Sequence, residues 1–167
     1  YDQCLSEALP DLVVVQDVGL HVDVVARRHD GRQHRPVGGR AVLEQQPDSI
    51  MALNNLAYSL AVHKASPQEA LPIAERAMKL SGGRSVAVAD TLAWVQHLLG
   101  RDADAARLFD AIVKGGPAGA DICLHAAIVF AQVGRLDAAR AQLDEALRLD
   151  PTLASTDQVK SLKERLK

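Results

Sequence analysis

The chain has 167 residues, a formal charge of −2 and a pI near 6.3. Its length suits one ordinary domain, and its charge balance offers no basic face of the kind that nucleic acid requires, so no nucleic-acid partner is expected. Hydrophobic residues make up 48% of the chain but aromatic residues only 3%. This composition favours close-packed helices with small side chains at their contacts.

Targeting signals are not visible in the sequence. No apolar run approaches the ~20 residues that a membrane-spanning helix needs, and no basic segment precedes an apolar one as in a signal peptide. The chain does not begin with Met, so we expect it to be the C-terminal part of a longer protein. The compartment stays open between cytoplasm and periplasm. Cys4 and Cys123 lie far apart in sequence, which favours ordinary buried thiols over a metal-ligand pair.

The first 40 residues differ from the rest. Residues 1–10 have apolar residues at helical spacing and end at Pro10, which is typical of the tail of a preceding repeat helix. Residues 11–40 combine β-branched stretches with RRHDGRQHRPVGGR, a run rich in Gly, Arg and His without periodicity. We expect 11–40 to be irregular: a degenerate repeat, a long loop, or a stretch translated out of frame.

From Ala41 the chain alternates helix-length apolar segments with helix-ending residues. Helices are predicted over 41–46, 50–63, 67–80, 86–99, 103–114, 121–133, 136–149 and 156–167. Asp48 or Ser49 is expected to cap the second of these, Ser85 the fourth, and Ser66 with Glu69 to form a capping box before the third. Glycines and prolines between the segments indicate short turns.

Small residues recur in these helices at a period near 34. Ala57 to Ala93 is 36 residues and Ala93 to Ala127 is 34, while Ala70 to Ala105 is 35 and Ala105 to Ala139 is 34. Such a period is the signature of a helical repeat array. Helices can approach closely only where side chains are small. The residues predicted to pack the repeats are Ala57, Ala70, Ala93, Gly100, Ala105, Ala127, Gly134 and Ala139.

These positions resemble the tetratricopeptide repeat (TPR), whose pattern is W-x2-L-G-x2-Y, A-x3-F, A and P. The Leu-Gly place is taken by Leu56-Ala57, Leu92-Ala93 and Ala126-Ala127, the aromatic place by Phe109 and Leu143, and the final Pro by Pro117 and Pro151. The first Trp of the pattern is absent. The stretches NNLAYSLA and DTLAWVQHLLGR also resemble TPR proteins of bacterial exopolysaccharide and PEP-CTERM protein-sorting systems.

The resemblance implies an all-α fold, a right-handed superhelical array of helix–turn–helix units. The array would cover 41–151, with three clear repeats at about 50–83, 84–117 and 118–151. Residues 152–167 are polar and would form a C-terminal capping helix, as a solenoid end requires.

In TPR arrays the first helices line a concave groove that binds peptides, and the residue after the small Ala points into it. Here the resemblance places Tyr58, Trp94 and Ile128 in that groove. The flanking candidates are Asn54, Asp90, His97 and Leu124. The alternative is that Tyr58 and Trp94 complete the core between repeats. A clamp for a C-terminal carboxylate is not expected, because these helices supply no Lys or Arg at the required places.

Catalysis is not predicted. His21, His29, His34 and Asp30 match no ligand spacing of a metal site, and no phosphate-binding loop or nucleophile motif occurs. No cofactor, metal or catalytic residue is therefore expected. The sequence favours a non-catalytic scaffold or adaptor that binds a peptide or helix. One alternative is a structural or oligomerisation module of a larger envelope- or secretion-associated protein, with homo-oligomers forming through an exposed N-terminal edge. A metal-dependent enzyme using the histidines of 21–34 is the last alternative.

Overall fold

The computed structural model describes residues 39–167. The predictions for 1–10, and for 11–40 except its last two residues, lie outside the described residues. Helix α2 (Gly39–Gln45) begins two residues before the predicted boundary, so Gly39 and Arg40 are helical rather than irregular. A glycine is tolerated at the start of a helix because the first amides have no partner within the helix in any case.

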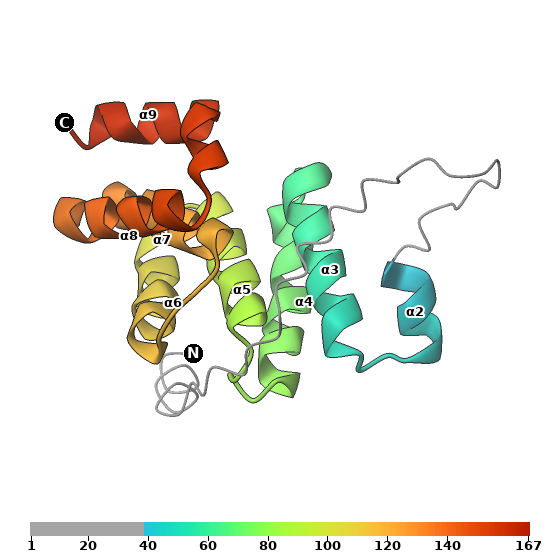
Figure 1. The fold of residues 1–167 in the computed structure, drawn as a ribbon. Helices are drawn as coiled ribbons and strands as arrows, with labels where there is room; N and C mark the ends of the chain where they lie inside the picture. The colour runs from blue at the N-terminus through green and yellow to red at the C-terminus, as the bar shows by residue number, and fades with distance from the viewer. Residues whose placement is uncertain (1–38) are drawn as a thin grey trace, which may run out of the picture.

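Three helix pairs follow α2 (Figure 1). The first pair is α3 (Ile50–Tyr58) and α4 (Pro67–Leu80), the second α5 (Val86–Leu98) and α6 (Asp102–Gly115), and the third α7 (Ala120–Gln132) and α8 (Leu136–Leu149). A 3₁₀ turn η2 (Pro151–Ser155) and helix α9 (Asp157–Arg165) end the chain. Over 39–167 there is no strand. The predicted all-α repeat array is confirmed.

The first helices of the pairs form one layer. Helix α3 contacts α5 and α5 contacts α7, while α4 packs against α5 and α6 against α7. Six alanines predicted to pack the repeats have no exposed surface: Ala57, Ala70, Ala93, Ala105, Ala127 and Ala139. A larger side chain at such a position would overpack the contact, at a cost of roughly 1–3 kcal/mol. We call the side presented by α3, α5 and α7 the inner face.

Glycines end the first helices of the second and third repeats. Gly100 has φ +73° and Gly134 φ +78°, a left-handed conformation that costs glycine little. Each allows the next amide to reach back into the helix: Arg101 N–H donates to Gln96 O at 2.9 Å, and Arg135 N–H to Phe130 O at 2.8 Å. These bonds occupy carbonyls that the helix end leaves open.

The first repeat turns differently. Residues Ser59–His63 form a π-helical segment, η1, directly after α3. The predicted helix over 50–63 is therefore α-helical in its first part and π-helical in its second. Ala65, where the later repeats have Gly, has φ +51°. The Ser66 side chain donates to Lys64 O at 3.3 Å and caps no amide of α4, so the predicted capping box is wrong. The wider π-helical turn and the longer connection account for the extra spacing of this repeat.

The left-handed alanine offers a matched pair of stability tests. We expect Ala65→Gly to raise the free energy of unfolding by about 0.5–1 kcal/mol, because the left-handed strain of roughly 1–2 kcal/mol exceeds the extra entropy of glycine in the unfolded chain. Gly100→Ala should lower it by about 1 kcal/mol, although nothing lies within 4 Å of the added methyl group. Urea denaturation of both variants measures this, and equal signs for the two would contradict the strain argument.

Helices α3 and α5 begin with the N-cap residues that the sequence predicts. Ser49 accepts from Ala52 N–H at 3.5 Å and Ser85 from Val88 N–H at 3.4 Å, as N-caps do.

Helix α9 lies across the end of the array (Figure 1) and buries Val159 and Leu162. The Arg140 guanidinium donates to Leu166 O at 2.6 Å. Among the described helices, none has the length and apolar character to cross a membrane.

Candidate functional site

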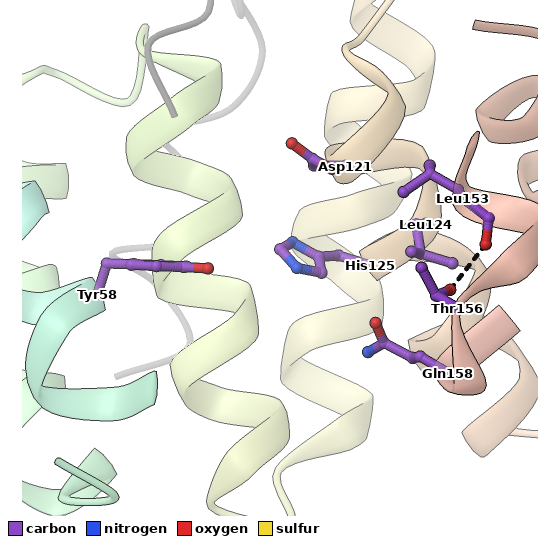
Figure 2. A pocket seen from close by; sticks show the side chains of 7 residues that line it. All are labelled: Tyr58, Asp121, Leu124, His125, Leu153, Thr156 and Gln158. Carbon is purple, nitrogen blue, oxygen red and sulfur yellow. Dashed lines mark hydrogen bonds between the residues drawn. The ribbon is translucent and has the colours of Figure 1, made fainter. Parts of the chain in front are cut away.

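A pocket of about 350 Å³ opens on the inner face. Tyr58, from the end of α3, forms one wall and points its hydroxyl toward His125 on α7 (Figure 2). Asp121 and Leu124 of α7 lie beside His125, and the C-terminal segment supplies the opposite side. The lining residues are Tyr58, Asp121, Leu124, His125, Leu153, Thr156 and Gln158. The pocket therefore joins the first repeat, the third repeat and the C-terminal segment.

The C-terminal side of the pocket is held by local hydrogen bonds. Thr156 is the N-cap of α9 and accepts from Val159 N–H at 3.3 Å. Its hydroxyl also donates to Leu153 O at 2.7 Å, the dashed line in Figure 2. Because Val159 is fully buried, this cap is tied to the packing of α9. The pocket wall is thus part of the fold rather than a free tail.

An aromatic stack connects the middle repeat to the pocket. The Trp94 ring on α5 stacks on His125 with 4.1 Å between ring centroids and an interplanar angle of 20°. On its own helix Trp94 also contacts His97 at 5.0 Å between centroids. Both Trp94 and Tyr58 are half-buried, which is the exposure typical of aromatic side chains that serve both packing and recognition.

His125 is held from the neighbouring repeat. Its Nδ1 lies 2.9 Å from Oδ1 of Asp90 on α5, and the Asp90 side chain is only 2% exposed. Burial lowers the pKa of His125, but the charge and hydrogen bond of Asp90, with the charge of Asp121, outweigh burial and raise this pKa above its ordinary 6.5. Asp90 therefore holds the imidazole in position and favours its protonated form.

The remaining predicted groove residues are absent from the lining of the pocket. Asp90 is buried and holds His125, so its carboxylate lies behind the lining. His97 Nδ1 lies 2.5 Å from Asp102 Oδ1, which joins α5 to the start of α6. Ile128 is half-buried against the core. The carbonyl oxygen of the Asn54 side chain is buried and has no hydrogen-bond partner among the described residues.

Several lining residues are not groove positions of the repeat pattern: Asp121, His125, Leu153, Thr156 and Gln158. For His125, the most central of them, the sequence contains one indication of its place. Asp90 and His125 are 35 residues apart, about one repeat length, as expected for residues that meet across neighbouring repeats. Leu153, Thr156 and Gln158 carry no such signal, because they follow the last repeat and reach the pocket only through the docking of α9.

Within residues 39–167, no group of three His, Cys, Asp or Glu side chains is placed to hold a metal ion. The histidines of 21–34, on which the metal alternative depends, lie outside the described residues, as does Cys4. Burial is the largest cause that raises the pKa of the Cys123 thiol to about 11. This thiol therefore stays protonated at neutral pH and is a poor nucleophile.

Neither a known family nor a curated protein matches this chain in sequence. Solved structures match it in fold. A thermophilic TPR protein of Thermus thermophilus is similar over 77% of this chain and 69% of its own, with a TM-score of 0.59 and 20% identity. YrrB, described as a TPR protein with an unusual peptide-binding site, is similar over 76% of this chain and 70% of its own, with a TM-score of 0.59 and 14% identity. The fold is therefore that of a TPR-like helical repeat array.

Proposed function

We propose that this protein is a non-catalytic interaction scaffold that binds a peptide or helical segment of a partner on its inner face. The observation that carries the proposal is the pocket between Tyr58 and His125, which joins the first repeat, the third repeat and the C-terminal segment. The half-buried Tyr58 lines this pocket, and the half-buried Trp94 stacks on its His125. Binding sites combine an apolar or aromatic lining with a few placed polar groups, and aromatic anchors contribute most of the energy of many interfaces.

The layout of the inner face supports an extended or helical ligand. Tyr58 and Trp94 occupy equivalent places in consecutive repeats, so a segment lying across α3, α5 and α7 would meet one aromatic ring after another. Asp121, Thr156 and Gln158 would supply polar contacts at the far end of that path. YrrB, which shares the fold, is by its description a peptide-binding protein, and this lends support from a related architecture.

The test is a partner capture with purified wild-type protein and a Tyr58→Ala/Trp94→Ala variant. Each of these side chains is half-buried and so keeps surface that a partner can cover. Loss of both should reduce capture at least about tenfold, which corresponds to the loss of about 1.4 kcal/mol of binding free energy at a moderate hot spot. Bound proteins from source-cell extract are quantified by mass spectrometry, and candidate segments are then measured as synthetic peptides.

The control is Val113→Ala/Leu149→Ala, which removes two exposed apolar side chains from the second helices α6 and α8. All variants must first give the same helical circular dichroism. Partners retained by the control and lost from the aromatic variant support the inner face as the binding site. Partners retained by both variants place the binding surface elsewhere and contradict the proposal.

A structural or oligomerisation role is the second candidate. It is favoured by Met51 on α3, whose side chain is 74% exposed near the first end of the described array. Light scattering over a dilution series separates the two roles, because a mass that is independent of concentration argues against association. The narrower resemblance to exopolysaccharide and PEP-CTERM sorting systems rests on two sequence stretches only and stays a prediction.

A further inference from the structure

The charges at the pocket indicate which kind of ligand side chain it could accept. Among the lining residues within 39–167, Asp121 is the one with a carboxylate, and none is Lys or Arg. The Asp90 carboxylate lies directly behind the lining residue His125. Even with His125 protonated, the carboxylates of Asp90 and Asp121 leave the described groups at the pocket with a net negative charge. An acidic side chain or a free C-terminal carboxylate would therefore be repelled.

The uncharged lining residues add acceptors. Thr156 has a hydroxyl oxygen and Gln158 an amide oxygen on the C-terminal side, while Tyr58 points its hydroxyl into the pocket from the facing side (Figure 2). A guanidinium group is planar, presents five N–H donors and no acceptor, and stacks on aromatic rings. The oxygens of Tyr58, Thr156 and Gln158, together with the Asp121 carboxylate, suit that group in hydrogen bonding and in charge.

We propose that the pocket takes the guanidinium group of an arginine in the bound segment. This inference rests on the proposed function and gives it a ligand chemistry: the partner presents a basic stretch, and one arginine of that stretch enters between Tyr58 and Asp121. Lysine is a weaker occupant, because its ammonium group has neither the planar fork nor the stacking surface of arginine.

Asp121 has a second explanation, which the test must separate from ligand binding. It lies in the first turn of α7, where a carboxylate is favoured by the helix dipole in any protein. If that were its whole role, Asp121→Asn would lower thermal stability slightly and leave ligand selection unchanged. A readout of which peptides are bound is therefore more informative than a readout of stability.

The experiment uses an array of random peptides, each of about a dozen residues. The array is probed with four versions of the 167-residue chain: wild type, Asp121→Asn, Asp121→Glu and Asp144→Asn. Asp144 is exposed on α8, so its variant matches the change in net charge away from the pocket. We expect peptides bound by wild type to be enriched in arginine, Asp121→Asn to lose the enrichment, and Asp121→Glu and Asp144→Asn to keep it.

The best peptide is then measured in solution with its key Arg or with Gln or Lys in that place. Asp121→Asn and the Arg-to-Gln change should each weaken binding roughly five- to tenfold, as for loss of one partly desolvated charged hydrogen bond. The two changes together should weaken it no more than either alone, because both remove the same contact.

The outcomes distinguish the two proposals. Peptides that bind wild type and lose affinity with Tyr58→Ala, but show no dependence on Arg or on Asp121, overturn the arginine assignment and leave the scaffold proposal standing. Absence of any peptide binding to wild type overturns both. Enrichment in Glu or Asp, or equal loss with Asp121→Asn and Asp144→Asn, also overturns the assignment.

Discussion

Replacing Phe109 with alanine is expected to lower the free energy of unfolding by about 3–5 kcal/mol. Phe109 lies on α6 and has no exposed surface, so the substitution leaves a cavity that the surrounding helices can fill only in part. Single domains are stable by about 5–15 kcal/mol, and the loss is therefore a large fraction of the total. Urea denaturation measures it, with circular dichroism reporting on all helices and the single Trp of the chain, Trp94, on the middle repeat.

Two further variants show whether the loss comes from the cavity. Phe109→Leu should cost less than Phe109→Ala, since Leu143 occupies the equivalent place of the third repeat and is itself buried. Leu149→Ala removes a side chain that is 42% exposed and should cost well under half of the Phe109→Ala effect. A change of less than about 1 kcal/mol for Phe109→Ala, far below the usual cost of such a cavity, would show that this aromatic position does not hold the second repeat together.

The helical repeats could be predicted because their determinants are local. A small residue in each helix, a turn residue between helices and a constant period define which segments pair, and the period alone places each pair against the next. Helix α4 has the predicted bounds of 67–80, and Ser85 caps α5 as expected. Each of these features depends on residues within a few positions of one another.

Features that depend on distant contacts could not be predicted in the same way. No sequence pattern predicts the π-helical segment η1 or the left-handed conformation of Ala65 after it. The pocket depends on distant contacts. Its walls come from α3, α7, η2 and α9, and only the docking of α9 brings Thr156 and Gln158 opposite Tyr58.

In the Trp94–His125–Asp90 arrangement, Asp90 makes a contact that the sequence does not predict. The TPR pattern predicts that Asp90 flanks the groove, because its position in the first helix matches a groove position. Its side chain is 2% exposed, and a buried carboxylate needs a partner. The partner, His125, comes from the next repeat, so this acid couples two repeats and positions an imidazole at the pocket.

His125→Leu is therefore expected to lower the free energy of unfolding at pH 7 by about 3–5 kcal/mol, because it leaves the Asp90 carboxylate buried without its partner. The double variant Asp90→Asn/His125→Gln keeps polar side chains in both places and removes both charges, so its loss should be clearly smaller than that of the single variant. The same denaturation measurements give both values. A double variant as unstable as His125→Leu would show that shape and packing, not the unpaired charge, decide the cost.

The Asp90–His125 pair also determines whether the free energy of unfolding rises or falls with pH. Burial lowers the pKa of His125, but Asp90 and Asp121 together raise it above its unfolded value near 6.5. A group with a raised pKa in the folded state binds its proton more tightly there, so its contribution to stability is complete below about pH 6.5 and is lost as the pH rises through the folded pKa. The stability difference between wild type and the double variant should therefore be larger at about pH 6 than at about pH 9. A difference that grows with pH would mean that burial, rather than Asp90, controls the titration of His125.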